Sequence, residues 1–167
     1  MGVSGSGKSS VAAALAARLG WDLAEGDDLH SPANVAKMAA GRPLTDDDRT
    51  PWLARVADWI DAELAAGHGA VVTCSALRRS YRDVLRRPAV LFVHLDGPRD
   101  LLAARLGARQ GHFMPVALLD SQLATLEPPG PHERAVRVGI DQPLAAQVDA
   151  IIQALGADDS SQDTKPV

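Results

Sequence analysis

The sequence predicts a three-layer α/β fold, in which a parallel sheet carries helices on both faces. Short apolar runs such as 70–74 and 90–95 have the composition of buried parallel strands and alternate with segments of helical periodicity. The chain also opens on Gly-Val-Ser-Gly-Ser-Gly-Lys-Ser at 2–9, a phosphate-binding loop that normally joins a strand to a helix. Its 167 residues suit one domain of this kind.

The loop at 2–9 predicts binding of a nucleoside triphosphate. Its glycines let the backbone wrap closely around phosphate oxygens, and Lys8 reaches the β- and γ-phosphates. The hydroxyl of Ser9 stands where Mg²⁺ takes a ligand, and the following helix adds the positive end of its dipole. A flexible Gly/Ser linker is the alternative, but the run leads directly into the strong helix former 10–19. ATP and Mg²⁺ are therefore the expected cofactors.

The strand that normally precedes such a loop has no residues of its own, since only Met1 stands before Gly2. In a doubly wound sheet that strand usually lies near the middle, buried on both faces. The hypothesis is therefore a truncated first strand. It predicts that several apolar residues added ahead of Met1 raise the melting temperature, and equal melting temperatures would refute it.

The remaining elements follow from hydrophobic periodicity and from the signals that start and stop helices. The expected strands are 21–24, 70–74, 90–95 and 136–140. The expected helices are 31–40 with Ser31 as N-cap, 45–66 capped by Thr45, 78–86, 98–108, 116–126 and 144–155. The helical pattern breaks at 109–115, which predicts a lid loop within about 105–118. A single domain over 1–155 and a disordered polar tail over 156–167 result.

Charge and cysteine content narrow the class of protein. The net charge of −4 argues against non-specific binding of nucleic acid, which needs a basic face. The single cysteine, Cys74, excludes an internal disulfide and fits a reducing compartment. No apolar run approaches the roughly 20 residues of a membrane span. We expect a cytoplasmic protein that binds neither nucleic acid nor membrane.

The kind of phosphate-loop protein follows from what accompanies the loop. A GTPase would carry an Asn-Lys-x-Asp guanine reader, which the sequence lacks, and motor or transporter ATPases are usually larger. Acidic residues after the first expected strand, scattered arginines and a lid-like loop favour a kinase for a small metabolite.

Several segments carry a more specific resemblance. They are Glu-Gly-Asp-Asp-Leu-His at 25–30, Gly-Arg-Pro-Leu-Thr-Asp-Asp-Asp-Arg at 41–49, Pro-Trp-Leu at 51–53, Cys-Ser-Ala-Leu at 74–77 and Gly-His-Phe-Met at 111–114. With the loop, the sequence resembles the gluconate kinase family from Gly2 to about Leu155. The resemblance implies ATP-dependent phosphorylation of D-gluconate, direct in-line transfer, Mg²⁺ dependence, a possible homodimer and a fold similar to shikimate kinase. A kinase for another hydroxy acid, or a catalytically silent nucleotide-binding protein, remains the alternative.

The expected nucleotide site combines the loop with arginines beside the lid, whose charge would neutralise the transferred phosphoryl group. Its members are Gly2, Ser4, Gly5, Ser6, Gly7, Lys8, Ser9, Ser10 and Arg105. Lys8, Asp27 and Arg109 are the expected catalytic residues, and Ser9 and Glu25 the expected metal ligands. Asp27 lies just beyond a strand end, and by analogy with related small kinases it would take the proton of the attacking hydroxyl.

The expected substrate site must bind an anionic polyol. Its members are Asp27, His30, Arg49, Ser75, Arg82 and His112. Arg49 and Arg82 are both candidates for the carboxylate, because a guanidinium binds a carboxylate through two parallel hydrogen bonds, although either could instead form a surface ion pair. His30 could equally close the turn before Pro32. Asp46 and Asp47 are interpreted as helix-capping residues, Asp48 is left open, and Cys74 is interpreted as a core residue.

Overall fold

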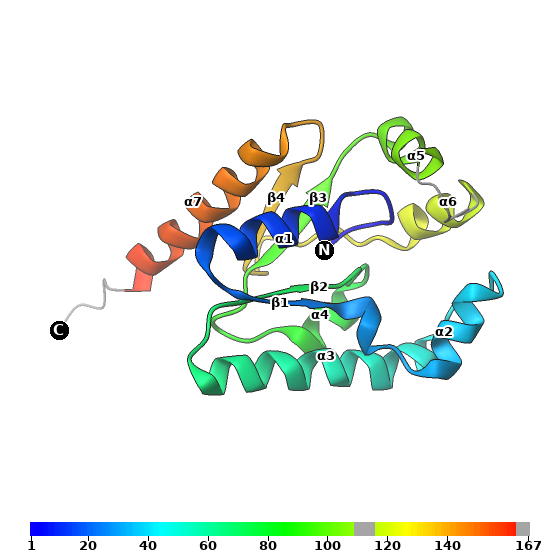
Figure 1. The fold of residues 1–167 in the computed structure, drawn as a ribbon, viewed down its shortest axis with the longest axis horizontal. Coiled ribbons are helices and arrows are strands. Elements are labelled where there is room, and N and C mark those ends of the chain that lie inside the picture. Colours follow the sequence, from blue (N-terminus) through cyan, green and yellow to red (C-terminus); the bar gives the residue numbers. More distant parts are fainter. Residues whose placement is uncertain (109–115, 163–167) are drawn as a thin grey trace.

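The computed structural model describes residues 1–108 and 116–162, which form helices packed on two pairs of parallel strands (Figure 1). The strands are β1 (Asp22–Glu25), β2 (Ala70–Thr73), β3 (Phe92–Asp96) and β4 (Ala135–Gly139). β1 pairs with β2 from Asp22 opposite Ala70, and β3 pairs with β4 from Phe92 opposite Ala135. The predicted alternation of parallel strands and helices is confirmed.

The helices lie on both faces of the strands. They are α1 (Lys8–Leu19), the 3₁₀ helix η1 (Gly26–Leu29), α2 (Pro32–Ala39), α3 (Asp46–Ala66), α4 (Arg79–Leu85), α5 (Arg99–Gly107), α6 (Val116–Thr125) and α7 (Leu144–Gln162). α1 packs on β1, β2 and α7, whereas α3 packs on β2 and α4 from the other face (Figure 1). No helix of the described ranges is both long and apolar enough to cross a membrane.

The last helix is longer than the sequence predicted. α7 continues to Gln162 rather than ending near 155, and the expected disorder of the tail over 156–167 stays a prediction. The remainder, 163–167, lies outside the described residues. Nothing but Gly156 interrupts helix-compatible residues there, and one glycine in a helix costs only about 1 kcal/mol relative to alanine.

Side-chain caps fix where α2 and α3 begin. The hydroxyl of Ser31 accepts a hydrogen bond from the Asn34 amide at 3.2 Å, and Pro32 fills the first position of α2, as predicted. At the start of α3, Thr45 Oγ1 accepts from the Asp48 amide at 3.3 Å, while the Asp48 carboxylate accepts from the Thr45 amide at 2.9 Å. Asp48 is therefore half of a reciprocal capping box.

Residues 1 and 2 lie between the two strand pairs. The amino group of Met1 donates to the Val93 carbonyl, and the Leu95 amide donates to the Met1 carbonyl at 3.0 Å. The Gly2 amide donates to the Ser75 carbonyl, just beyond β2, at 3.1 Å. Burial lowers the pKa of the Met1 amino group to about 5.

An apolar cavity of about 350 Å³ runs along β2 and β3 beside Met1. Its walls include Val11, Leu15, Val72, Leu85, Phe92 and Leu95. The hypothesis of a truncated first strand stays a prediction.

The buried side chains form two clusters. The first joins α1, α5 and α7 to β3 and β4 through residues such as Leu15, Leu102, Ile140 and Ile151. The second joins α3 and α4 to β2 and β3 and contains Trp52, Val56 and Cys74. Burial raises the pKa of the Cys74 thiol to about 11, so this cysteine stays protonated and is a core residue, as predicted.

Candidate active site

The loop at 2–9 is a tight turn whose glycines are required by its shape. Gly2, Gly5 and Gly7 have φ values of 137°, 81° and 88°, which side chains rarely tolerate. A Cβ at Gly5 would lie 2.9 Å from the Leu102 carbonyl oxygen. The Lys8 ammonium donates to the carbonyls of Gly2 and Val3 at 3.1 and 3.0 Å, so it lies over the loop. The loop opens directly into α1, which suits it to hold phosphate oxygens.

Arg105 lies against this loop, as expected for a nucleotide-site residue. Its Nη2 donates to the Ile140 carbonyl at 2.7 Å, and its Nη1 would be 3.7 Å from a Cβ at Gly7. The other two residues assigned to the lid region, Arg109 and His112, lie outside the described residues.

The two expected metal ligands meet beside the loop. Ser9 Oγ donates to Glu25 Oε2 at 3.2 Å, although the residues lie on α1 and β1. Thr73 Oγ1, at the end of β2, donates to the same carboxylate oxygen at 2.6 Å. Hydroxyl and carboxylate oxygens are the ligands that Mg²⁺ prefers, so this set fits the cation. Sequence reasoning missed Thr73, although its position at a strand end was the available signal.

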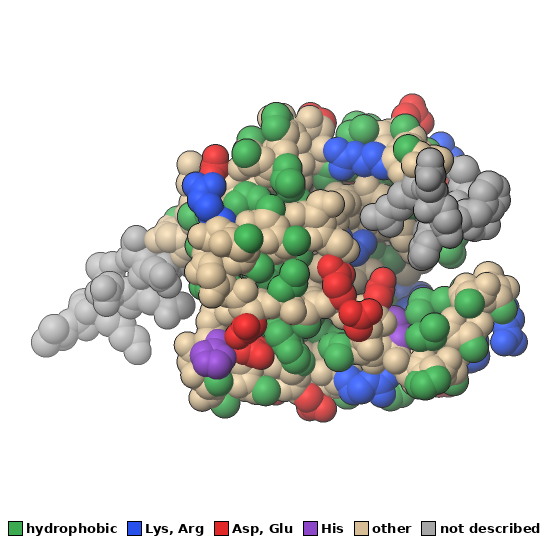
Figure 2. Space-filling model, in the orientation of Figure 1, with side chains coloured by type: hydrophobic (Ala, Val, Ile, Leu, Met, Phe, Trp, Pro, Cys, Tyr) green, Lys and Arg blue, Asp and Glu red, His purple; other side chains and the backbone are tan. Residues whose placement is uncertain are grey.

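Asp27 stands on η1, the short helix that follows β1 on the same side as the loop. α3 holds this segment through main-chain contacts, because Trp52 Nε1 donates to the Gly26 carbonyl at 2.7 Å and Arg55 Nε to the Leu29 carbonyl at 2.6 Å. A Cβ at Gly26 would collide with the Thr73 carbonyl oxygen at 2.0 Å, so only glycine permits this approach to β2. Figure 2 shows acidic side chains gathered over this segment, between helices α1 and α3.

His30 lies next to Asp27 and is fixed by stacking. Its ring lies on Trp52 with the ring centroids 4.3 Å apart and an interplanar angle of 16°. Its Nδ1 is 3.4 Å from the Asn34 side-chain nitrogen. Burial lowers the pKa of His30 below its usual value, so the ring is neutral at pH 7 and presents one nitrogen donor and one acceptor.

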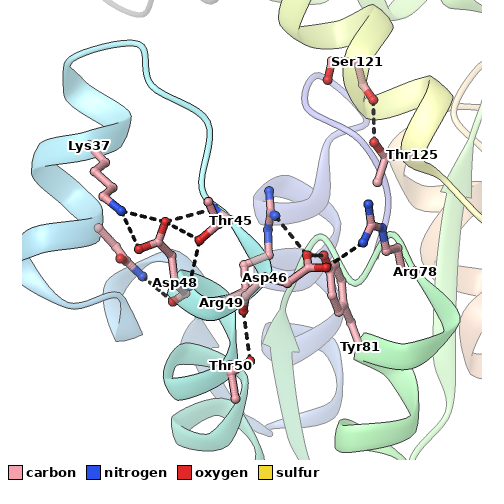
Figure 3. A network of polar contacts seen from close by, with 11 residues as sticks. Lys37, Thr45, Asp46, Asp48, Arg49, Thr50, Arg78, Tyr81, Ser121 and Thr125 are labelled. Carbon is pink, nitrogen blue, oxygen red and sulfur yellow. Dashed lines mark hydrogen bonds and ion pairs between the residues drawn. The ribbon is translucent and has the colours of Figure 1, made fainter.

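A second polar group gathers at the starts of α3 and α4 (Figure 3). The Asp46 carboxylate accepts from Arg78 Nη1 at 2.8 Å and from the Tyr81 hydroxyl, and lies 3.6 Å from Arg49 Nη1. The capping interpretation of Asp46 is therefore incomplete, because Thr45 and Asp48 make the cap and Asp46 binds these three side chains instead. The sequence analysis did not assign Arg78 or Tyr81 to the site.

Arg82 is buried and fully paired within the protein, which corrects its assignment to the substrate site. Its side chain is 1% exposed and its Nε and Nη2 donate to the Glu133 carboxylate at 2.5 and 2.9 Å. Its Nη1 donates to the Ala76 carbonyl at 3.1 Å, so every guanidinium nitrogen has a protein acceptor. Ser75, in contrast, is half-buried beside the loop, where its carbonyl accepts from Gly2.

Another group of possible metal ligands lies elsewhere. Asp22, Glu63 and His68 hold ligand atoms within 4.8 Å of one another near the start of β1, at the opposite end of the strand from η1. His68 Nδ1 is 3.3 Å from Glu63 and 3.5 Å from Asp22, so the group is a surface ion-pair cluster away from the loop.

The site unites a phosphate-binding loop, oxygen ligands suited to Mg²⁺ and an acidic segment at the carboxyl ends of parallel strands, which defines a P-loop kinase. A family model described as an AAA domain matches residues 1–129. The chain is 54% identical over 161 residues to the gluconokinase of Gluconobacter oxydans, covering 95% of this chain and 90% of that protein. It is 44% identical over 158 residues to the thermoresistant gluconokinase of Escherichia coli, covering 93% of this chain and 90% of that one. The chain belongs to the gluconokinase family.

Solved structures agree with this assignment. A gluconokinase from Sinorhizobium meliloti superposes with a TM-score of 0.85 at 49% identity, covering 99% of this chain and 95% of that one. The APS kinase CysC of Mycobacterium tuberculosis superposes with a TM-score of 0.67 at 21% identity over 93% of this chain and 94% of that one, which shows a shared fold.

Proposed function

We propose that this chain transfers the γ-phosphoryl group of ATP to D-gluconate and forms 6-phospho-D-gluconate. The observation that carries the proposal is the meeting of the phosphate loop with the acidic segment 25–28, through the hydrogen bond from Ser9 to Glu25, in a chain 54% identical to a gluconokinase. Such a site places the phosphate donor and a carboxylate base at one edge of the strands, as in-line transfer requires.

Charge on the transferred group is neutralised by the cations of the nucleotide site. Lys8 and Arg105 lie at the loop, and Arg109 follows in the lid sequence. Ser9 and Glu25 would hold Mg²⁺, directly or through water, with Thr73 orienting the glutamate. A bound Mg²⁺ supplies further neutralisation of the β- and γ-phosphate oxygens.

The acceptor is oriented by residues of η1 and its surroundings. Asp27 accepts the proton of the attacking hydroxyl, and the neutral ring of His30 can donate to or accept from a substrate hydroxyl. Ser75 and His112 would contact further hydroxyls. Arg49, in the first turn of α3, binds the carboxylate.

Two substitutions with a matched control test this function in a coupled assay of ADP release with gluconate. Lys8→Ala should lower kcat about 10²–10³-fold and Asp27→Asn about 10²–10⁴-fold, with unchanged melting temperatures. Asp28→Asn, at the neighbouring exposed acid, should leave turnover within twofold. Normal turnover in either of the first two variants removes the role assigned to that residue.

The same assay separates the alternative functions. Faster turnover of shikimate or another hydroxy acid than of gluconate would reassign the substrate. Binding of ATP without turnover of any acceptor would indicate a silent nucleotide-binding protein. We also propose a cytoplasmic homodimer, consistent with the lone buried Cys74 and the family resemblance; light scattering on the purified chain tests the dimer.

A further inference from the structure

We infer that Arg78 acts together with Arg49 as a two-arginine clamp for the substrate carboxylate, held in position by Asp46 and Tyr81. The inference rests on the proposed function, because it assigns the part of the substrate that distinguishes gluconate from a neutral polyol. It also replaces Arg82 as a candidate for the carboxylate, because Arg82 is buried in an ion pair with Glu133.

The two arginines come from different elements and converge on one aromatic ring. Arg49 lies in the first turn of α3, and Arg78 immediately precedes α4. Their guanidinium carbons lie 5.8 and 5.7 Å from the centroid of the Tyr81 ring, within the range of cation–π attraction. Figure 3 shows both guanidinium groups pointing the same way, toward α6.

The Asp46 carboxylate shows what this group can bind. Arg78 Nη1 donates to one of its oxygens at 2.8 Å, while the Tyr81 hydroxyl and Arg49 approach the other. The hydrogen bond from Tyr81, followed by the charges of Arg78 and Arg49, lowers the pKa of Asp46, so it is ionised at pH 7. Donors that converge on the Asp46 carboxylate in this way can also donate to the carboxylate of a ligand.

The charges of the cluster favour an anion. Two guanidinium groups face one carboxylate, which leaves a net charge of +1 (2 − 1), and the amino-terminal end of the α3 dipole adds to it. The side chains of Arg49 and Arg78 are 29% and 41% exposed, so a ligand can reach both. The guanidinium of Arg82, at 1% exposure, is closed to a ligand.

The clamp lies next to the parts of the site that hold nucleotide and acceptor. Arg78 is three residues after Ser75, whose carbonyl binds Gly2 of the phosphate loop. Arg49 is on the same helix as Trp52, which fixes the Asp27 segment through the Gly26 carbonyl at 2.7 Å. The substrate can therefore extend from its carboxylate at the clamp to its terminal hydroxyl at Asp27.

The test measures the KM and kcat for D-gluconate and the inhibition constant of D-glucitol, the neutral polyol of equal chain length. Arg78→Ala and Arg49→Ala should each raise the KM for gluconate about 10- to 100-fold, the usual size of a lost charged hydrogen bond. Glucitol inhibition should stay within twofold, because it has no carboxylate. Tyr81→Phe, which keeps the ring, should raise the KM less than either arginine variant, with kcat unchanged.

Controls separate the clamp from folding and from the proposed function. Arg79→Ala removes the neighbouring exposed arginine, which pairs with Asp83 at 3.9 Å, and should change neither constant. Arg78→Lys should recover part of the lost affinity, since it restores charge without the fork. An unchanged gluconate KM in Arg78→Ala, or an equal loss for gluconate and glucitol, overturns the clamp. Absence of gluconate turnover in the unsubstituted chain instead overturns the proposed function.

Discussion

Arg78 and Arg82 stand four residues apart, and each binds a carboxylate, but their surroundings are opposite. The Arg82–Glu133 pair is closed off, with side-chain exposures of 1% and 6%. The Arg78–Asp46 pair is open to solvent, with exposures of 41% and 60%. The Arg82 guanidinium is saturated by two carboxylate oxygens and by the main-chain carbonyls of Ala76 and Leu77. Arg78 donates to the exposed Asp46 carboxylate through Nη1 at 2.8 Å.

The difference separates a structural arginine from a ligand-binding one. A buried guanidinium has lost its hydration, so it depends on its protein acceptors for stability. An exposed pair contributes at most about 1 kcal/mol, because water competes for both partners, and it can be exchanged for a ligand at little cost. Substitution at Arg82 should therefore affect folding, and substitution at Arg78 should affect affinity for the substrate.

Removal of the buried guanidinium should have the largest effect on stability. Arg82→Ala leaves the Glu133 carboxylate buried without its partner, so we expect a loss of about 3–5 kcal/mol in the free energy of unfolding, measured by urea denaturation. Arg79→Ala is the matched control and should change it by less than about 0.5 kcal/mol. The double variant Arg82→Met with Glu133→Leu should recover most of the loss, since well-packed apolar residues can replace a buried ion pair. A stable Arg82→Ala variant with weakened gluconate binding would reverse the two assignments.

The Arg82–Glu133 pair should make the free energy of unfolding depend on pH in the acid range. The hydrogen bond from Arg82 is the main cause that lowers the pKa of Glu133 from 4.5 to about 2. A carboxyl whose pKa is lower in the folded state contributes stability that is complete above pH 4.5 and is lost as the pH falls toward 2. Unfolding free energies between pH 5 and pH 2 should fall more steeply for the unsubstituted chain than for Glu133→Gln. Equal slopes would show that this carboxylate is not held by Arg82.

The sequence was sufficient for the elements and for the loop at 2–9. Strand composition, the Ser31 and Thr45 caps and the loop at 2–9 are local signals, and each lies within a few residues of its expected place. The end of the last helix was predicted too early, because the weak helix formers after Gly156 still continue α7 to Gln162.

Local sequence signals could not show which of the two arginines, Arg78 or Arg82, is buried. Arg78 is the N-cap of α4 and Arg82 lies in the last turn of the same helix, and only the packing of that helix decides which one is buried. The acceptor that buries Arg82, Glu133, is 51 residues away in sequence. Thr73 was missed for the same reason, because its partner Glu25 is 48 residues distant on another strand. Contacts between side chains of different elements produce no periodic pattern in the sequence, so sequence patterns do not predict them.

The smallest expected effect concerns the first turn of α3, which carries Asp46 and Arg49. Thr45→Ala removes the hydroxyl that caps the Asp48 amide, so α3 should fray at its first turn and lose about 1 kcal/mol of stability. Because that turn carries half of the clamp, the KM for gluconate should rise severalfold while the pH dependence attributed to Glu133 stays unchanged. Thr50→Ala is the matched control, since its hydroxyl donates to the Asp46 carbonyl within the same helix, at 2.9 Å. A stability loss in Thr45→Ala without any change in KM would mean that the clamp does not depend on the first turn of α3, and that Arg78 alone recognises the carboxylate.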